Sequence, residues 1–281
     1  MNPTRITELK LIAANVRKNV LTAVHAAASG HPGGSLSIAD VLTLLYFEVM
    51  NVDPKDPQNA DRDRFVLSKG HCAPALYSVL AERGYFPTED IKTFRKTGSY
   101  LQGHPDMKSV PGVDMSSGSL GQGICAANGM ALAGKIDGKS YRVYTILGDG
   151  ELQEGQVWEA AMYAPHYKLD NLTAFVDFNG LQIDGNISDV MSPLPIDKKF
   201  ADFGWHVIVT DAHDFEALLS AIEEAKETKG KPTMIIMKSV KGKGVSFMEN
   251  NPAWHGSAPN DEQYAQAIEE LDAAIAKLKE A

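Results

Sequence analysis

A regular alternation of β-like runs and helical patterns in the second half of the chain constrains its fold more than any other feature. Runs rich in Val, Ile and aromatic residues indicate strands at residues 142–147, 172–178, 205–209 and 233–237. Helical spacing of apolar residues separates them at residues 157–167 and 215–228. Strands that alternate with helices form parallel βαβ units. The sequence therefore predicts an α/β fold, with a parallel β-sheet and helices on both faces.

The first half of the chain is mainly helical in pattern. Apolar residues at helical spacing predict helices at residues 4–28, 37–50, 74–83 and 123–134. Residues 100–123 are rich in Gly, Ser and Pro and indicate a long loop, a feature that often carries function. A last helix is expected over about 260–280, with Asn260 and Gln263 capping its start. The length suits a single domain, 1–281.

Composition excludes several classes of protein. Hydrophobic residues make up 44% and charged residues 22% of the chain, which is typical of globular domains and not of disordered ones. The formal net charge of −9 argues against a nucleic-acid partner, because phosphate contacts need clustered cations. The charged N-terminus does not resemble a signal peptide, and no apolar run is long enough for a membrane span. We therefore expect a cytoplasmic protein whose Cys72 and Cys125 pack as small buried side chains.

Two strand ends carry the residues that point most directly to chemistry. Residues 144–151 form an apolar run that ends in Gly148-Asp149-Gly150, and Asn179 follows the next predicted strand. Parallel pairing would bring Asp149 and Asn179 to one edge of the sheet, where ligands bind. A carboxylate, an amide oxygen and a loop carbonyl suit Mg²⁺ together with phosphate oxygens. The alternative is a pair of turns that need Gly, Asp and Asn for backbone reasons, but their occurrence on successive strands favours a metal-diphosphate site.

Four histidines stand in loops where they are candidates for proton transfer. His31 and His104 each precede a proline, His71 follows Ser-Lys-Gly, and His255 follows the glycine-containing loop 241–244. Histidine donates to hydroxyls and phosphates and exchanges protons near neutral pH. The loop 241–244 is equally compatible with a solvated turn. The other histidines lie in helical or strand-edge contexts and are expected to be structural: His25, His166, His206 and His213.

Seven segments of the sequence resemble the N-terminal half of transketolase, within the thiamine diphosphate-dependent superfamily. They occur in family order at residues 29–34, 63–71, 103–105, 118–123, 148–155, 177–185 and 254–256. The Gly148-Asp149-Gly150 run followed by Asn179 is similar to the superfamily's cofactor signature. That signature ends in two asparagines, whereas Phe178 precedes Asn179 here, and the implied ligand is the second of the pair. The resemblance implies the thiamine diphosphate-binding fold of the diphosphate (PP) domain.

The resemblance also implies which residues hold the cofactor and its metal. Asp149, Asn179 and the carbonyl of Leu181 would bind Mg²⁺, with Ca²⁺ or Mn²⁺ as alternatives, and the ion would bridge to the diphosphate. Gly148 belongs to the same turn, and Gly150 would donate its backbone N–H to the diphosphate. We therefore expect thiamine diphosphate and a divalent cation as cofactors.

Further residues are assigned roles around the thiamine ring. The carbonyl of Gly118 would meet the cofactor's 4′-amino group, and Leu120 would lie beneath the bent cofactor. Glu154 would belong to an acidic relay between paired active sites, and Asp177 would support the site from behind. The glycines of residues 118–123 do not make a dinucleotide-binding fingerprint, because a polar loop precedes them where that motif needs a strand.

The implied activity is that of transketolase (EC 2.2.1.1), a transferase of the pentose phosphate pathway. A two-carbon ketol unit moves from a ketose phosphate to an aldose phosphate, and the cofactor's thiazolium carbon supplies the nucleophile and electron sink. His71 and His255 would contact the diphosphate and face the substrate. His31 and His104 would bind the donor's hydroxyl and carbonyl oxygens and shuttle protons.

Family members also need a glutamate that activates the cofactor and lies in a second, pyrimidine-binding domain. The predicted helix at about 260–280 is where the linker to that domain would start in a fused chain. The expectation is an N-terminal subunit of a split transketolase, active only with a separate C-terminal subunit in an A2B2 heterotetramer. Most groups that grip the sugar phosphate would then lie on the partner.

Two other functions stay open. The nearer is a different thiamine diphosphate enzyme, such as the α subunit of a 2-oxo acid dehydrogenase or a transketolase specialised for an unusual sugar. Four histidines suit polyol substrates better than simple oxo acids. The other is a non-catalytic regulatory subunit that keeps the fold, which the presence of every implied ligand type argues against.

Overall fold

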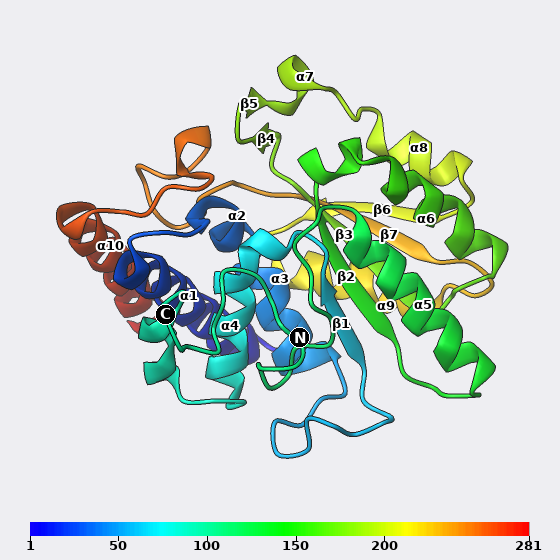
Figure 1. Cartoon of the computed structure of the whole chain (residues 1–281), viewed down its shortest axis with the longest axis horizontal. Helices are drawn as coiled ribbons and strands as arrows, with labels where there is room; N and C mark the ends of the chain where they lie inside the picture. Colours follow the sequence, from blue (N-terminus) through cyan, green and yellow to red (C-terminus); the bar gives the residue numbers. More distant parts are fainter. Residues whose placement is uncertain (281) are drawn as a thin grey trace.

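The computed structural model describes residues 1–280, and at its centre is a parallel sheet of five strands (Figure 1). The strands lie in the order β1 (Arg64–Leu67), β2 (Val143–Gly148), β3 (Leu172–Phe178), β7 (Thr233–Lys238) and β6 (His206–Asp211). The predicted α/β fold is confirmed, and four strands match their predicted ranges within two residues at each end. Sequence reasoning missed β1, because a run of four residues is too short to show a pattern.

Helices cover both faces of the sheet. Along β2, Tyr144 and Ile146 pack into one buried cluster, whereas Val143 and Leu147 pack into the other, because successive side chains of a strand point to opposite faces. The first cluster includes residues of α1 (Pro3–Ala27), α3 (Ala39–Leu44), α4 (Ala73–Arg83), α9 (Phe215–Glu227) and α10 (Asp261–Glu280). The second includes residues of α5 (Gln122–Ile136), α6 (Gly155–His166) and α8 (Ile196–Asp202) (Figure 1).

Local signals set where the helices begin and end. The Asp214 side chain accepts hydrogen bonds from two backbone N–H groups in the first turn of α9. Gly84 ends α4 in the left-handed conformation, with φ at 97°. The predicted capping of α10 is confirmed, because Asn260 and Gln263 each accept from the other's backbone N–H at 2.9 and 3.0 Å.

The region predicted as one helix over 37–50 is divided in the structure. It contains the end of α2 (Pro32–Ser37), all of α3, and a π-helical turn, η1 (Leu45–Val49). Short elements form the loops at the carboxyl edge of the sheet and elsewhere: η2 (Gly70–Cys72), η3 (Thr88–Thr93), η4 (Gly150–Gln153), β4 (Leu181–Gln182), β5 (Gly185–Asn186), α7 (Ile187–Val190) and η5 (Pro252–Trp254). The hairpin β4–β5 and α7 project beyond the sheet in Figure 1.

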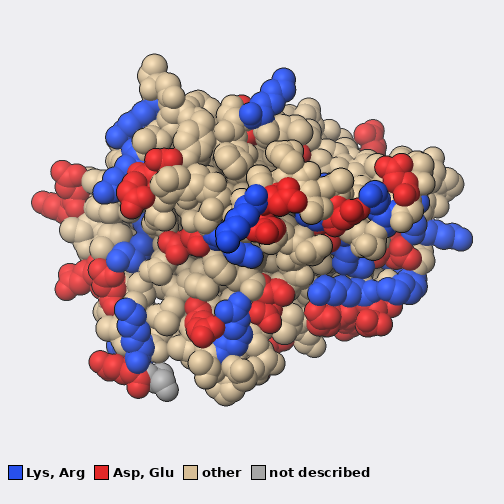
Figure 2. All heavy atoms as spheres, turned by 90° about the horizontal axis from the view of Figure 1, so that it is seen from below, with Lys and Arg blue, Asp and Glu red and all other residues tan. Residues whose placement is uncertain are grey.

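The surface carries both charge signs. In the view from below, acidic and basic side chains are interspersed, and neither sign forms a continuous patch on that face (Figure 2). Across residues 1–280, every helix lacks the combination of length and apolarity that a membrane span needs. The prediction that both cysteines are buried is confirmed for Cys72 and wrong for Cys125, which is exposed on α5. The small residues of α5 did not reveal which side of that helix faces the sheet.

Candidate active site

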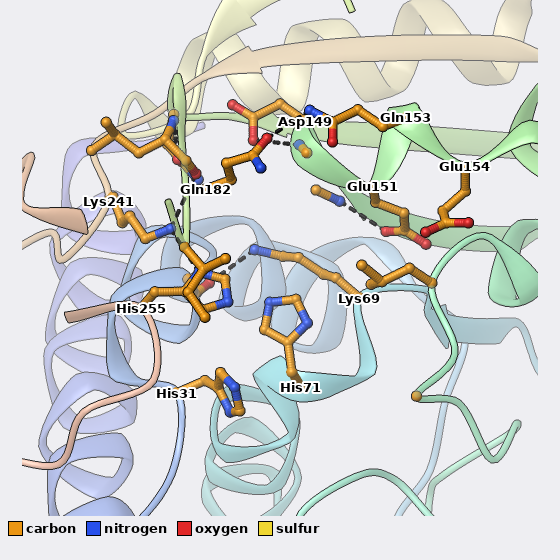
Figure 3. A pocket seen from close by; sticks show the side chains of 18 residues that line it. His31, Lys69, His71, Asp149, Glu151, Gln153, Glu154, Gln182, Lys241 and His255 are labelled. Atoms are coloured by element: carbon orange, nitrogen blue, oxygen red, sulfur yellow. Dashed lines mark hydrogen bonds between the residues drawn. The ribbon is translucent and has the colours of Figure 1, made fainter. Parts of the chain in front are cut away.

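A cavity of about 310 Å³ opens at the edge of the sheet where the parallel strands end (Figure 3). Four wall residues follow four of these strands: Lys69 after β1, Asp149 after β2, Asn179 after β3 and Lys241 after β7. In an open parallel sheet this is the edge where ligands bind. The lining includes most residues singled out from the sequence: His31, His71, Gly118, Leu120, Gly148, Asp149, Gly150, Glu154, Asn179, Leu181 and His255.

Asp149 is the most deeply buried of the predicted ligands in this cavity. Only 2% of its surface is exposed, and its carboxylate accepts hydrogen bonds from the backbone N–H groups of Gly150 at 2.8 Å and Gly180 at 2.6 Å. Burial, and then the nearby charge of Asp177, raise the pKa of Asp149 to about 6. A carboxylate whose ionised form is penalised in this way gains from a cation placed beside it.

The other two predicted metal ligands lie in the loop that follows β3. Gly148 pairs with Asp177 in the sheet register, so the turns after β2 and β3 are neighbours, as predicted. The Oδ1 atom of Asn179 accepts from the N–H of Leu181 at 3.1 Å, and the carbonyl of Leu181 accepts from Lys241 Nζ at 3.1 Å. Residues 1–280 contain no group of three or more His, Cys, Asp or Glu that would hold a metal by themselves. A cation here would depend on one carboxylate with amide and carbonyl oxygens.

Asp177 lies beneath the cavity and does not line it. It is fully buried and accepts hydrogen bonds from Lys69 Nζ at 2.6 Å, Ser37 Oγ at 2.6 Å and Asn179 Nδ2 at 3.0 Å. Burial alone would raise the pKa of Asp177, but the charge and hydrogen bond of Lys69 outweigh it, and the pKa is lowered. Asp177 therefore orients the side chain of Asn179 from beneath the cavity.

Two buried lysines in the wall were not singled out from the sequence. Lys69 and Lys241 are each 2% exposed, and Lys241 Nζ lies 3.0 Å from Nδ1 of His255. Burial, and then repulsion by Lys69, lower the pKa of Lys241. The loop 241–244 is thus not a solvated turn. The available signal was that each lysine immediately precedes a glycine, Gly70 or Gly242. Lys69 is paired with Asp177, and the buried Lys241 beside this pair suits an anionic ligand.

Three imidazoles form a triangle on one side of the cavity (Figure 3). The ring centroids of His31, His71 and His255 are 5.1 to 5.4 Å apart. Burial is the first cause that lowers their pKa values, to about 4 for His31, to about 3 for His255 and well below the usual value for His71. The rings are therefore neutral at pH 7, so each has a donor and an acceptor nitrogen. Nδ1 of His31 is buried without a hydrogen-bond partner, as in a site that takes a polar ligand.

His104 is exposed and does not line the cavity, and its ring lies against the loop that contains Gly118. A Cβ at Gly118 would come within 3.1 Å of the His104 ring, so a larger residue there would push against this ring. The carbonyl of His104 accepts from the buried hydroxyl of Tyr77 at 2.9 Å, which fixes the loop. Burial, and then the charge of Arg95, lower the pKa of His104. Leu120 lines the cavity from the same loop as Gly118.

Two glutamates follow the turn after β2, and they differ in environment. Glu154 is exposed at the cavity rim. Glu151, which the sequence reasoning missed, is 2% exposed and accepts from Ser68 Oγ and from the backbone N–H groups of Gly121 at 2.8 Å and Gly148 at 3.0 Å. Burial raises the pKa of Glu151. These hydrogen bonds connect the start of α5 to the end of β2. In the sequence, the position of Glu151 two residues after Asp149 was the feature that could have identified it.

The remaining histidines have structural contacts, as expected. His213 bonds Asp40 at 2.7 Å through Nδ1 and accepts from the N–H of Val240 at 3.0 Å through Nε2. His206 bonds a glutamate on α9, and His25 stacks on a tyrosine of α10. The ring of His166 lies edge-on to the neighbouring tyrosine at the end of α6.

The chain resembles known proteins along most of its length. Residues 9–276 match the family model described as transketolase, thiamine diphosphate binding domain. The chain is 48% identical over 257 residues to a 6-deoxy-6-sulfo-D-fructose transketolase subunit of Clostridium sp. (strain MSTE9), covering 92% of this chain and 94% of that protein. It is 42% identical over 275 residues to one of the subunits of apulose-4-phosphate transketolase from Phocaeicola vulgatus, covering 98% of both.

A solved structure gives the same relationship in three dimensions. Transketolase from Pichia stipitis, crystallised with sedoheptulose-7-phosphate, matches with a TM-score of 0.86 at 34% identity. The match covers 98% of this chain but 44% of that chain. The fold thus corresponds to less than half of a longer protein, and to nearly the whole of the two shorter relatives.

Proposed function

This chain belongs to the transketolase family, whose thiamine diphosphate-binding domain it matches, and we propose that it forms one half of a two-chain sugar transketolase. In this proposal residues 1–281 make one diphosphate-binding domain, and a separate chain brings the pyrimidine-binding domain. Together they transfer a two-carbon ketol unit between sugar phosphates. The observation that carries the proposal is the cavity itself, where two buried lysines and a cluster of neutral imidazoles line the same space.

The residues present fit thiamine diphosphate. Two buried lysines, Lys69 and Lys241, stand in the wall beside the turn of Gly148 and Gly150, where a diphosphate would find positive charge and close approach to the backbone. The unpartnered Nδ1 of His31 and the neutral rings beside it offer hydrogen bonds. When bound, the cofactor supplies the carbon nucleophile and the electron sink. Gly118 and Leu120 would contact its pyrimidine end.

A divalent cation is proposed between the diphosphate and the turns after β2 and β3. Asp149 would supply a carboxylate oxygen, Asn179 its amide oxygen and Leu181 its carbonyl. The raised pKa of Asp149 supports this assignment, because a cation would relieve the cost of its buried charge. Lys241 now bonds the Leu181 carbonyl at 3.1 Å, so it would share or leave that oxygen when a cation binds. We propose Mg²⁺, with Ca²⁺ or Mn²⁺ as alternatives.

The histidines would handle the sugar. Because their rings are neutral, His31, His71 and His104 would each offer one N–H donor and one acceptor nitrogen to hydroxyl and carbonyl oxygens. Nδ1 of His255 accepts from Lys241, so His255 would offer its Nε2–H as a donor. Such a ring takes a proton from a substrate hydroxyl and returns it, which the breaking and forming of a carbon–carbon bond beside a carbonyl requires. Glu154, at the rim, would belong to an acidic link towards a second active site.

A partner subunit is supported by what surrounds the cavity. Ile183 lines the cavity and is 63% exposed, and Met191 and Leu194 on the same segment are 64% and 45% exposed. Exposed large apolar side chains beside a site are typical of a surface that another chain covers. Relatives of matching length are named as subunits, which supports the same inference. We propose that the assembly is an A2B2 heterotetramer.

The donor sugar is proposed from the relatives rather than from the cavity. A transketolase specialised for an unusual ketose is favoured, because two relatives that match nearly full length are named for 6-deoxy-6-sulfo-D-fructose and apulose 4-phosphate. The four histidines would contact the ketol end, which such donors share with xylulose 5-phosphate. The distinguishing end of the sugar would be read mainly by the partner.

The proposal is tested by reconstitution. The purified chain and its partner are mixed with thiamine diphosphate and Mg²⁺, and turnover is measured with xylulose 5-phosphate, 6-deoxy-6-sulfofructose and apulose 4-phosphate as donors and an aldose phosphate as acceptor. We expect turnover only with both chains. Turnover with pyruvate and a lipoyl acceptor instead would indicate a 2-oxo acid dehydrogenase, and no turnover with any sugar would favour a regulatory role.

Cofactor binding is tested separately by calorimetry on the complex. Asp149→Ala should abolish binding of thiamine diphosphate with Mg²⁺, whereas Asp137→Ala, an exposed acid at the end of α5, should leave it unchanged. Unchanged affinity in Asp149→Ala would overturn the proposed metal site.

A further inference from the structure

Arg95 joins two loops that are far apart in the sequence and that both carry a histidine of the site. Its Nη1 donates to Ser29 Oγ at 2.6 Å, two residues before His31. Its backbone N–H donates to the carbonyl of Leu101 at 2.8 Å, three residues before His104. The side chain and backbone of one residue thus hold the approaches to both histidines.

The backbone of Arg95 indicates that this position is held against a local preference. Its φ is 59°, in the left-handed region that a non-glycine residue seldom adopts. Such a conformation is unfavourable for a residue with a side chain and persists where the surrounding structure requires it. Glycine would adopt this φ without cost, so the side chain is the feature that gives arginine a role here.

The guanidinium is packed tightly between the two loops. A Cβ at Gly103, the residue before His104, would lie 2.7 Å from Arg95 Nε, so the loop passes directly over the guanidinium. On another side the cation lies 5.4 Å from the ring centre of Phe94. Nε of Arg95 is buried without a hydrogen-bond partner, which is unfavourable. The other contacts of the guanidinium must therefore offset this unfavourable burial.

We propose that Arg95 is a positioning residue that fixes the loops of His31 and His104 as one rigid unit and sets the electrostatic environment of both rings. The proposal rests on the proposed function only in assigning these two histidines to the sugar. It adds a residue that does not line the cavity.

The charge of Arg95 acts on both histidines and on no other ring of the site. After burial, it is the first cause that lowers the pKa of His31 and of His104. His31 is also faced by His104 and Lys241 and lies beside the rings of His71 and His255, whereas Arg95 is the single charged group that lowers the pKa of His104. The causes that act on His71 and His255 do not include Arg95. A neutral ring can both accept and donate a proton at a sugar hydroxyl, so this charge favours the form the site needs.

The test uses the full chain alone, without partner, cofactor or sugar, and follows the histidine ring protons by NMR during a pH titration. In Arg95→Gln the pKa values of His31 and His104 should both rise, so that the protonated fraction of His31 at pH 5.5 grows about threefold or more, while the titrations of His71 and His255 stay unchanged. In Arg95→Lys the rise in pKa of the two rings should be less than half as large, because lysine keeps the positive charge although it loses the planar arrangement of donors. Arg83→Gln is the matched control, because Arg83 also bonds a carbonyl and lies over a phenylalanine ring but is remote from the four histidines.

Two results would overturn the inference. One is an Arg95→Gln chain that unfolds at the wild-type temperature and whose four histidines titrate as before. The other is an equal shift of all four rings, which would indicate general loosening rather than a local charge. If Arg95→Gln does not fold, Arg95→Lys decides, because the proposed role predicts a partial rise confined to His31 and His104, whereas wild-type titration of all four rings would refute it. Absence of transketolase turnover in the reconstituted complex would remove the proposed function and leave these titrations unaffected.

Discussion

Replacing Asp149 by asparagine should make the metal-free chain more stable at neutral pH while removing its capacity to bind a metal-diphosphate group. Asp149 is 2% exposed, and its pKa is raised from 3.8 to about 6 by burial and by Asp177. Between these two pH values the folded chain holds a proton that the unfolded chain has released, so stability falls as pH rises through that window. Above about pH 6 the loss is complete.

The magnitude follows from the size of the shift. Each pKa unit corresponds to about 1.4 kcal/mol, so ionisation of Asp149 costs the folded chain about 3 kcal/mol at pH 7. Asparagine keeps an oxygen for one of the two backbone N–H donors but turns an amide towards the other, which costs about 1 kcal/mol. That cost does not change with pH. The stability difference between Asp149→Asn and wild type should therefore grow by about 2 kcal/mol between pH 4.5 and pH 7.5.

The assay is urea unfolding of the wild type and of Asp149→Asn, each in the presence of a chelator and at several pH values. Addition of Mg²⁺ with thiamine diphosphate should then stabilise the wild type and leave the variant unchanged. A stability difference that stays constant with pH would refute the argument that the buried charge is unfavourable. Equal stabilisation of both chains by Mg²⁺ and cofactor would refute the role of this carboxylate as a ligand.

Three further predictions concern packing and charge around the same cavity. Gly123→Ala places a methyl group 2.4 Å from a backbone carbon just after β1, so thermal unfolding should show a loss of stability of about 2 kcal/mol or more. Gly129→Ala in the same helix has open space around it and should leave stability unchanged or slightly raised. Lys69→Met leaves the buried carboxylate of Asp177 without its cation and should lower the free energy of unfolding by about 3–5 kcal/mol. Adding Asp177→Asn to Lys69→Met should recover part of that stability, and purely additive losses in a double-mutant cycle would contradict their pairing. Inorganic pyrophosphate added with Mg²⁺ should raise the pKa of His255 above its value of about 3, because a nearby anion favours the protonated ring. An NMR titration that shows a lowered pKa would contradict diphosphate binding beside His255.

The order of elements and the edge of the sheet that carries the site were predictable from the sequence. The alternation of strand and helix patterns, and Gly148-Asp149-Gly150 followed by Asn179, are local features that persist whatever the rest of the chain does. Parallel pairing of β2 and β3 then brings those two turns together. β1 was missed because four residues carry too little pattern, and the exposed side of Cys125 was missed because small residues mark no helix face.

The behaviour of the charged and titratable residues depends on the tertiary structure. Lys69 and Lys241 read as ordinary lysines in the sequence, yet both are buried beside the same cavity, and Arg95 joins the loops of His31 and His104. These residues are far apart along the chain, and their burial and mutual distances arise only on folding. Residue types and their order are written in the sequence. The electrostatic potential at each titratable side chain is a sum over the charges and dipoles near it in space, so it is set only when the protein folds.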